Sequence, residues 1–153
     1  MSILPQYALF VILQFWPLVL HLVSAVWYER QRSRYQKHWL WQLEQVADLT
    51  PLEQSCAGFH ASSGRGAPVV HPVPRLVRAL LVRHLQDLSF RQSEELLDNH
   101  LLFKQFVGYE LFEPPPDHTT LCRFELWVLE YQPDLFFDEI LTQVYRLYPE
   151  ERE

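Results

Sequence analysis

The sequence predicts an all-α protein, a multi-helix bundle that contains a helix-turn-helix-like segment. Apolar residues make up 48% of the 153-residue chain, which is enough for the core of one ordinary domain. In several segments these residues recur at spacings of three and four, as they do on the buried face of a helix. Proline, glycine and helix-capping residues separate the segments, so short helices joined by tight turns are expected.

An aromatic-rich N-terminal helical region is predicted over residues 1–48. The part from Met1 to Tyr28 has no charged residue, and the 20 residues from Ala8 to Trp27 are long enough to span a bilayer. Basic residues follow, as they do on the cytoplasmic flank of a membrane span. They are Arg30, Arg32, Arg34 and Lys37.

A stripe in the same stretch favours a protein environment over a membrane anchor. Its members recur at alternating steps of three and four, so they share one side of a helix that can bend at a proline. They are Gln14, Pro17, His21, Ser24 and Tyr28. A helix surrounded by lipid has no use for such a stripe, so contact with protein is expected and a membrane anchor is the less favoured alternative.

The helical pattern is expected to continue beyond Tyr28 to Trp41 and Val46. Arg30, Arg34 and Lys37 lie at positions i, i+4 and i+7 and share one helical face. Two interpretations stay open for this face: an ordinary solvated surface, which is favoured, or a set of phosphate contacts.

A second unit is predicted over residues 49–145, and it begins with a helix-start pattern. Thr50 is expected to be the N-cap and Pro51 the first helical residue, with Glu53 closing a capping box. This short helix is expected to end near Phe59. The following segment 61–68, ASSGRGAP, is a loop by composition and the best candidate for an internal boundary.

The next expected helix starts at Pro72 and Pro74. Its apolar residues lie close to one face, and Arg75, Arg78 and Arg83 spread over the remainder. The pattern therefore predicts an amphipathic helix with a basic exterior.

Two further helices have clear ends in the sequence. Ser89 and Gln92 have the spacing of a capping box, although the serine at position 93 removes the apolar contact of a hydrophobic staple. A helix from Leu101 to Val107 should end at Gly108, where glycine can adopt the left-handed conformation.

The last helices follow the extended run Pro114 to Pro116. Asp117 is expected to cap a helix that begins with His118, Thr119 and Thr120, because its carboxylate can accept hydrogen bonds from free backbone amides. A capping role is therefore favoured over a catalytic one for this aspartate. Pro133 should interrupt the helix, and Asp134 should cap a final helix that runs to about Tyr145, before an acidic tail at residues 146–153.

The net charge of −6 is unevenly distributed along the chain. Up to Arg123 there are 11 basic and 11 acidic residues, whereas from Phe124 onward there are 2 basic and 8 acidic residues. The body of the protein is therefore neutral, and its overall acidity does not exclude DNA binding.

No metal site, cofactor or catalytic motif is predicted. The pairs Cys56 with His60 and His118 with Cys122 could together bind zinc, but neither has the CxxC spacing of a zinc site, and two cysteines are too few for a disulfide framework. The sequence also lacks GxSxG, Walker A, HExxH and GxGxxG patterns. No signal peptide is recognisable, so a reducing cytoplasmic location is expected.

The run from His71 to Phe124 resembles the N-terminal, InsH-type domain of insertion-sequence transposases. The order HPxxxLVRALLV, LSFRQSEELLDNHLLFKQFVG and PDHTTLCRF carries the resemblance, which covers about residues 50–145. Its most specific parts are the motif from Pro116 to Thr120 and the turn from Phe106 to Gly108. The family commonly has Arg-Phe-Arg where this chain has Arg123-Phe124-Glu125, so one positive charge near a candidate phosphate contact is missing.

The resemblance implies a protein that recognises the terminal inverted repeats of a mobile element. It also implies a catalytic core in which three carboxylates on an RNase H-like fold hold two divalent metals. The 29 residues from Glu125 to Glu153 cannot supply that core, so the chain is expected to be truncated before it and to perform no chemistry alone.

The expected partner is therefore DNA, bound weakly by this chain alone. Hydroxyl side chains at the start of a helix-turn-helix-like third helix suit contacts to phosphates and base edges. Basic residues supply further phosphate contacts. The candidate DNA-binding residues are Arg75, Arg78, Arg83, Arg91, Lys104, Thr119, Thr120 and Arg123.

Two alternatives stay open from the sequence. In one, the aromatic N-terminus and the acidic tail mediate oligomerisation or another interaction, with a homo-oligomer or a separately encoded catalytic domain as partner, or they mask the basic helices. In the other, the chain is a decayed transposase remnant without activity.

Overall fold

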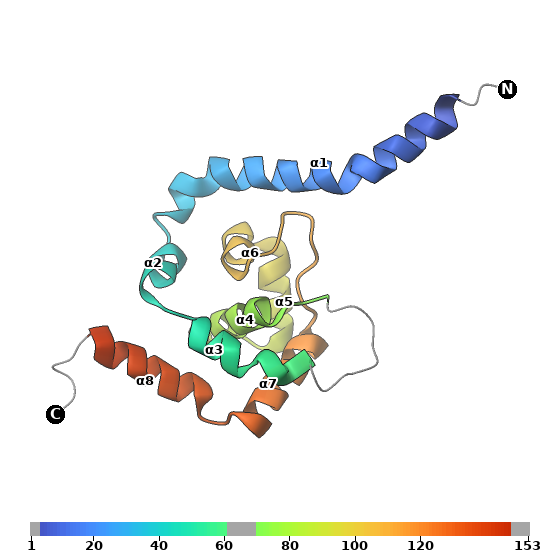
Figure 1. Cartoon of the computed structure of the whole chain (residues 1–153). Helices are drawn as coiled ribbons and strands as arrows, with labels where there is room; N and C mark the ends of the chain where they lie inside the picture. Colours follow the sequence, from blue (N-terminus) through green and yellow to red (C-terminus); the bar gives the residue numbers. More distant parts are fainter. Residues whose placement is uncertain (1–3, 61–69, 148–153) are drawn as a thin grey trace.

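The computed structural model describes residues 4–60 and 70–147, and it confirms the predicted all-α, multi-helix class. In these two ranges every regular element is a helix, and Figure 1 shows their arrangement. The α-helices and the single 3-10 helix are α1 (Leu4–Tyr35), α2 (Trp39–Val46), α3 (Thr50–Ser55), η1 (Ala57–His60), α4 (Val73–Leu85), α5 (Phe90–Asn99), α6 (Leu101–Val107), α7 (His118–Tyr131) and α8 (Leu135–Leu147).

Helix α4 lies at the centre of the bundle. It packs against α3, η1, α5, α6 and α7, and seven of its thirteen residues are buried. The buried residues are Val73, Leu76, Val77, Ala79, Leu80, Leu81 and Val82. A helix with neighbours on several sides cannot have the one apolar face and free basic exterior that the sequence pattern predicts, so α4 differs from that expectation.

Three predicted helix ends are confirmed. Ser89 and Gln92 form a reciprocal capping box at the start of α5, and Asp117 caps α7. Gly108 ends α6 in the left-handed conformation with a φ of 97°. At the staple position Ser93 is buried, and its hydroxyl donates a hydrogen bond to the Ser89 carbonyl at 2.9 Å.

Two predicted helix ends are wrong. Thr50 lies in the first turn of α3 rather than at its N-cap, and its amide donates to the Asp48 carboxylate at 3.0 Å. The N-terminal helix also does not run unbroken to Val46, because a turn separates α1 from α2 and the His38 imidazole caps α2 by accepting from the Leu40 amide. Nearby polar side chains therefore capture backbone amides at both places.

Helix α1 lies across one side of the bundle, and its N-terminal part bends and runs past the bundle's edge (Figure 1). Pro17 lies inside this helix, where the missing amide permits a bend. Helix α8 packs against α3 at the other end of the chain. No helix in the described ranges has the length and hydropathy needed to cross a membrane.

Some predictions concern residues outside the described ranges. The loop expected at 61–68 lies in the gap between the two ranges, and most of the expected acidic tail at 146–153 lies beyond the second one. The boundaries predicted at residues 48/49 and 145/146 stay predictions.

Candidate nucleic-acid interface

The start of α7 presents hydroxyl groups beside its N-cap. The Asp117 carboxylate accepts hydrogen bonds from the Thr120 amide at 2.6 Å and from the Thr119 hydroxyl at 2.8 Å. These bonds, above all the one from the Thr120 amide, lower the pKa of Asp117 below its usual value. The aspartate therefore stays ionised at neutral pH and holds the first turn in place.

A second carboxylate fixes the same turn to α5. Glu94 accepts from the His118 amide at 3.0 Å and lies 2.7 Å from the His118 Nδ1 atom. The hydrogen bond from the His118 amide contributes most to the lowered pKa of Glu94. The Glu94 contacts thus set the position of α7's first turn relative to α5.

Two exposed arginines flank this turn. Arg91 lies on α5, one helical turn before Glu94, and lines a hollow of about 390 Å³ together with Pro114 and Pro115, which lead into α7, and with Glu94, Glu95 and Asp98. Arg123 lies one turn into α7, with its guanidinium 3.4 Å from the Thr120 hydroxyl. Neither arginine pairs with a carboxylate in the described part of the chain. Thr119, Thr120 and Arg123 therefore lie together at the start of α7, whereas Arg91 lies on α5, beside the segment that leads into α7.

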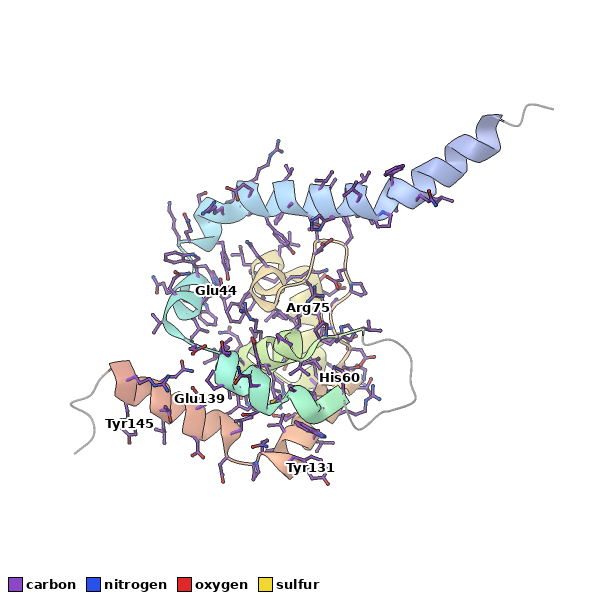
Figure 2. The ribbon with its side chains drawn as sticks, viewed as in Figure 1. Glu44, His60, Arg75, Tyr131, Glu139 and Tyr145 are labelled. Carbon is purple, nitrogen blue, oxygen red and sulfur yellow. The ribbon has the colours of Figure 1, made fainter. Side chains whose placement is uncertain are left out.

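The three candidate arginines of α4 are engaged inside the protein. Arg75 pairs with Glu113, Arg78 lies 3.1 Å from Glu44, and Arg83 lies 2.9 Å from Glu125. Figure 2 shows Arg75 near the middle of the bundle. Each of these side chains is less than a third exposed, so the positive charges are largely neutralised before any ligand arrives.

Aromatic rings hold the same guanidinium groups. Arg75 stacks 4.7 Å from the centroid of the Tyr109 ring, Arg78 lies 5.6 Å from that of Phe106, and Arg83 lies 4.2 Å from that of Phe90. Cation–π contacts of this kind add to the ion pairs. The Arg78 guanidinium also donates to the Phe106 carbonyl at 2.9 Å. These arginines thus stabilise the contacts of α4 with its neighbours.

Lys104 is buried rather than exposed to a ligand. Only 3% of the residue is exposed, and its ammonium donates to the Leu111 carbonyl at 3.1 Å. Removal from water lowers the pKa of Lys104. The lysine fixes the chain segment that follows α6.

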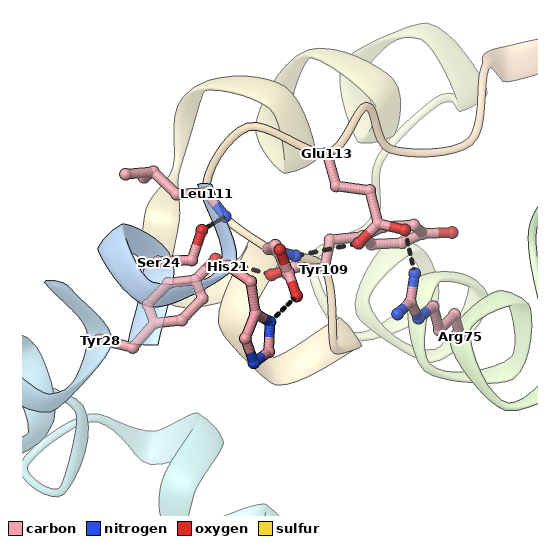
Figure 3. A network of polar contacts seen from close by, with 8 residues as sticks. His21, Ser24, Tyr28, Arg75, Tyr109, Leu111 and Glu113 are labelled. Atoms are coloured by element: carbon pink, nitrogen blue, oxygen red, sulfur yellow. Dashed lines mark hydrogen bonds and ion pairs between the residues drawn. The ribbon is translucent and has the colours of Figure 1, made fainter. Parts of the chain in front are cut away.

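A polar network joins α1 to residues 109–113, and its partners were not predicted from the sequence. The Tyr28 hydroxyl donates to the Tyr109 carbonyl at 2.7 Å, and the Ser24 hydroxyl accepts from the Leu111 amide at 3.1 Å (Figure 3). His21 contacts Glu110 through its Nδ1 atom. Burial contributes most to raising the pKa of Tyr28 to about 12, so the hydroxyl keeps the proton that it donates.

This network confirms that part of the polar stripe on α1 faces protein. His21, Ser24 and Tyr28 all contact the segment between α6 and α7. The spacing of the stripe, at alternating steps of three and four, is the sequence signal that predicted contact with protein. The partners lie more than 80 residues away in the sequence, and no local pattern could name them.

The described residues contain no group of three or more histidine, cysteine, aspartate or glutamate side chains that could hold a metal ion. Cys56 is buried and its thiol pKa is raised to about 11 by removal from water, whereas Cys122 is partly exposed. Both thiols are free.

Comparison with known proteins gives one match. None of the curated proteins and none of the solved structures matches the chain significantly. The family described as Transposase domain (DUF772) matches residues 28–125, a range that extends from the end of α1 to Glu125 in α7 and includes the α5–α7 junction. The match covers more than half of the chain and includes the motifs from His71 to Phe124. The chain therefore belongs to the DUF772 family of transposase domains.

Proposed function

We propose that this chain is the DNA-recognition part of a transposition system and binds terminal-repeat DNA at the α5–α7 junction. The observation that carries the proposal is Arg123, which has no carboxylate partner among the described residues and lies beside the Thr120 hydroxyl in the first turn of α7, together with the exposed Arg91 on the neighbouring α5. Arginines bind phosphates, and hydroxyl groups at a helix start bind phosphates or base edges. Membership of a transposase-domain family supports DNA as the ligand.

The affinity of the chain alone is expected to be modest. Of the eight DNA-binding residues predicted from the sequence, Arg75, Arg78, Arg83 and Lys104 are held by partners within the protein. Arg91, Thr119, Thr120 and Arg123 form the proposed contact set. Because two cations neutralise few phosphates, binding should be weak and should depend only moderately on salt.

In this proposal strand cleavage and joining belong to a catalytic domain other than the helices described. The resemblance implies a catalytic core built on a sheet, whereas every regular element of the described residues is a helix. A catalytic domain of the same transposition system is the proposed partner for that step, and DNA recognition is the proposed contribution of the helices described.

A binding titration tests the recognition function. Full-length protein is titrated into a labelled duplex that carries the terminal inverted repeat of the adjoining element, and into a duplex of shuffled sequence, at several salt concentrations. We expect tighter binding to the repeat. Lack of salt-dependent binding to either duplex at micromolar protein contradicts the proposal.

Variants locate the interface. Arg91→Ala and Arg123→Ala should each weaken binding and lower the slope of log affinity against log salt by about 0.9, the contribution of one phosphate contact. Arg32→Ala is the matched control, because Arg32 is an exposed arginine on α1 that pairs with Glu29. If the control weakens binding as much as the two variants do, the interface lies elsewhere.

A further inference from the structure

The outer surface of α1 is strongly apolar although it faces solvent. Within residues 13–35 of this helix, eight large apolar residues, of which all but Leu13 lie on its outward half at 100° per residue, are between 43% and 62% exposed. They are Leu13, Phe15, Trp16, Leu18, Val19, Leu22, Val23 and Val26. Continuous apolar surface of this extent on a protein in water marks an interaction site.

The apolar residues include a regular seam on the side of α1 that faces away from the bundle. Phe15, Val19, Leu22 and Val26 follow one another at steps of four, three and four. At 100° per residue this seam lies about 150° around the helix from the stripe of His21, Ser24 and Tyr28. That stripe contacts the bundle, so the seam faces outward, and its spacing is that of residues which pack between two helices in a coiled coil.

A hollow on the same outer surface suits an apolar side chain. It has a volume of about 300 Å³, and all of its lining residues belong to α1. They are Leu22, Val23, Val26, Trp27 and Arg30. A neighbouring helix would fill this hollow with a side chain of its own, as a knob fills a hole.

We propose that α1 pairs with α1 of a second copy of this chain, antiparallel and around a two-fold axis between Val19 and Leu22. In this register Phe15 of one copy lies opposite Val26 of the other, beside the hollow. Each copy then offers the same apolar surface to the other, as a two-fold interface requires. The pairing is independent of DNA binding.

The distribution of charge determines the antiparallel direction. Residues 1–28 carry no charge, whereas Arg30, Arg32 and Arg34 lie near the C-terminal end of α1. A parallel pair would bring these cations of both copies together, which costs free energy. An antiparallel pair places them beside the uncharged N-terminal half of the other helix.

The apolar surface is large enough for a stable dimer. At the exposures given above, the seven of these side chains other than Leu13, which lie within about 90° of the seam, present on the order of 600 Å² per copy, at the lower end of stable interfaces. Each partner in a stable interface of standard size contributes about 800 Å². The length of α1, 32 residues, allows the seam to be covered along its whole extent.

The oligomeric state of the full chain tests the pairing. Size-exclusion chromatography with light scattering should give twice the monomer mass of 18.3 kDa at micromolar concentration. Leu22→Glu should shift the protein to a monomer by placing a carboxylate beside the axis. Leu126→Glu is the matched control, because Leu126 is 59% exposed on α7, and this variant should remain a dimer. A wild-type monomer overturns the proposal, and so does a dimer that persists in Leu22→Glu.

Cross-linking tests the direction without depending on a destabilising change. Phe15→Cys and Val26→Cys proteins are oxidised singly and as a mixture, with wild type as the background for the native thiols. A disulfide that forms only in the mixture supports the antiparallel pair, whereas one that forms within each single variant overturns it. Flotation with phosphatidylcholine and phosphatidylglycerol vesicles tests lipid as the occupant instead, and co-flotation of monomeric protein also overturns the proposal.

Discussion

Replacing Glu125 with leucine removes the carboxylate that joins α7 to two basic side chains of α4. One oxygen of Glu125 lies 2.9 Å from the Arg83 guanidinium and 2.9 Å from the His84 imidazole. The side chains of Arg83 and Glu125 are only 19% and 14% exposed. Without Glu125 the guanidinium loses its ion-pair partner while the surrounding protein still shields it from water.

The structure sets the size of the expected loss. Removing one partner of a fully buried ion pair costs about 3–5 kcal/mol. Arg83 is partly exposed and keeps its contact with the Phe90 ring, so the loss should be smaller. Its Nε atom, however, is buried and makes no hydrogen bond within the described residues, which limits how the guanidinium can rearrange. We expect Glu125→Leu to lower the free energy of unfolding by about 2–3 kcal/mol and Tm by about 5–10 °C.

Urea unfolding followed by helical circular dichroism measures this loss, at one fixed protein concentration because association changes apparent stability. Glu130→Leu is the control, since Glu130 is exposed on the same helix and should change stability by less than about 0.5 kcal/mol. The double variant Arg83→Leu with Glu125→Leu should be more stable than Glu125→Leu alone, because it leaves no unpaired charge. A loss below about 0.5 kcal/mol in Glu125→Leu, or a double variant less stable than that single one, refutes the reasoning.

Three further predictions concern single positions. Gly108→Ala should destabilise the protein by about 1–2 kcal/mol, because φ is 97° at this position. Gly58→Ala is the control and should cost less, because its added carbon would meet the Trp127 ring at an ordinary contact distance of 3.5 Å. Thermal unfolding compares the two variants. Asp117→Ala should cost about 1 kcal/mol at pH 7. Its folded-state pKa lies below the unfolded value, so the cap stabilises the protein above about pH 4, and the difference from wild type should shrink as pH falls further, in urea titrations across pH. Lys104→Met should leave the DNA affinity and the slope of log affinity against log salt unchanged, because the ammonium is buried. A lower slope in this variant would show that the Lys104 ammonium contacts a phosphate and would contradict the prediction.

The structure gives a physical reason for Glu125, which stands where the family pattern commonly has an arginine. From the sequence, this residue only removes a positive charge near a candidate phosphate contact. In the structure its carboxylate neutralises Arg83, 42 residues earlier in the chain. An arginine at position 125 would place a third basic side chain beside Arg83 and His84, so the carboxylate suits this bundle whatever the chain binds.

The successes and failures of the helix predictions follow from the range of the interactions involved. Ser89, Gly108 and Asp117 act on backbone groups within a few residues, so a short sequence pattern was sufficient. Thr50 was misplaced because the competing Asp48, two residues earlier, captured its amide. A preference for one cap over another depends on backbone geometry that composition alone does not give.

By itself the sequence determined the all-helical class, most helix ends and the transposase-like family, because periodicity, capping and motif order are local properties of the chain. The tertiary structure alone decided which charges remain free. Arg75, Arg78 and Arg83 meet glutamates that lie 38, 34 and 42 residues away, and their spacing carries no sign of those partners. An arginine can bind a phosphate only if no carboxylate of the folded protein already neutralises it. The set of candidate DNA-binding residues is therefore smaller in the structure than in the sequence, and it is limited to the α5–α7 junction.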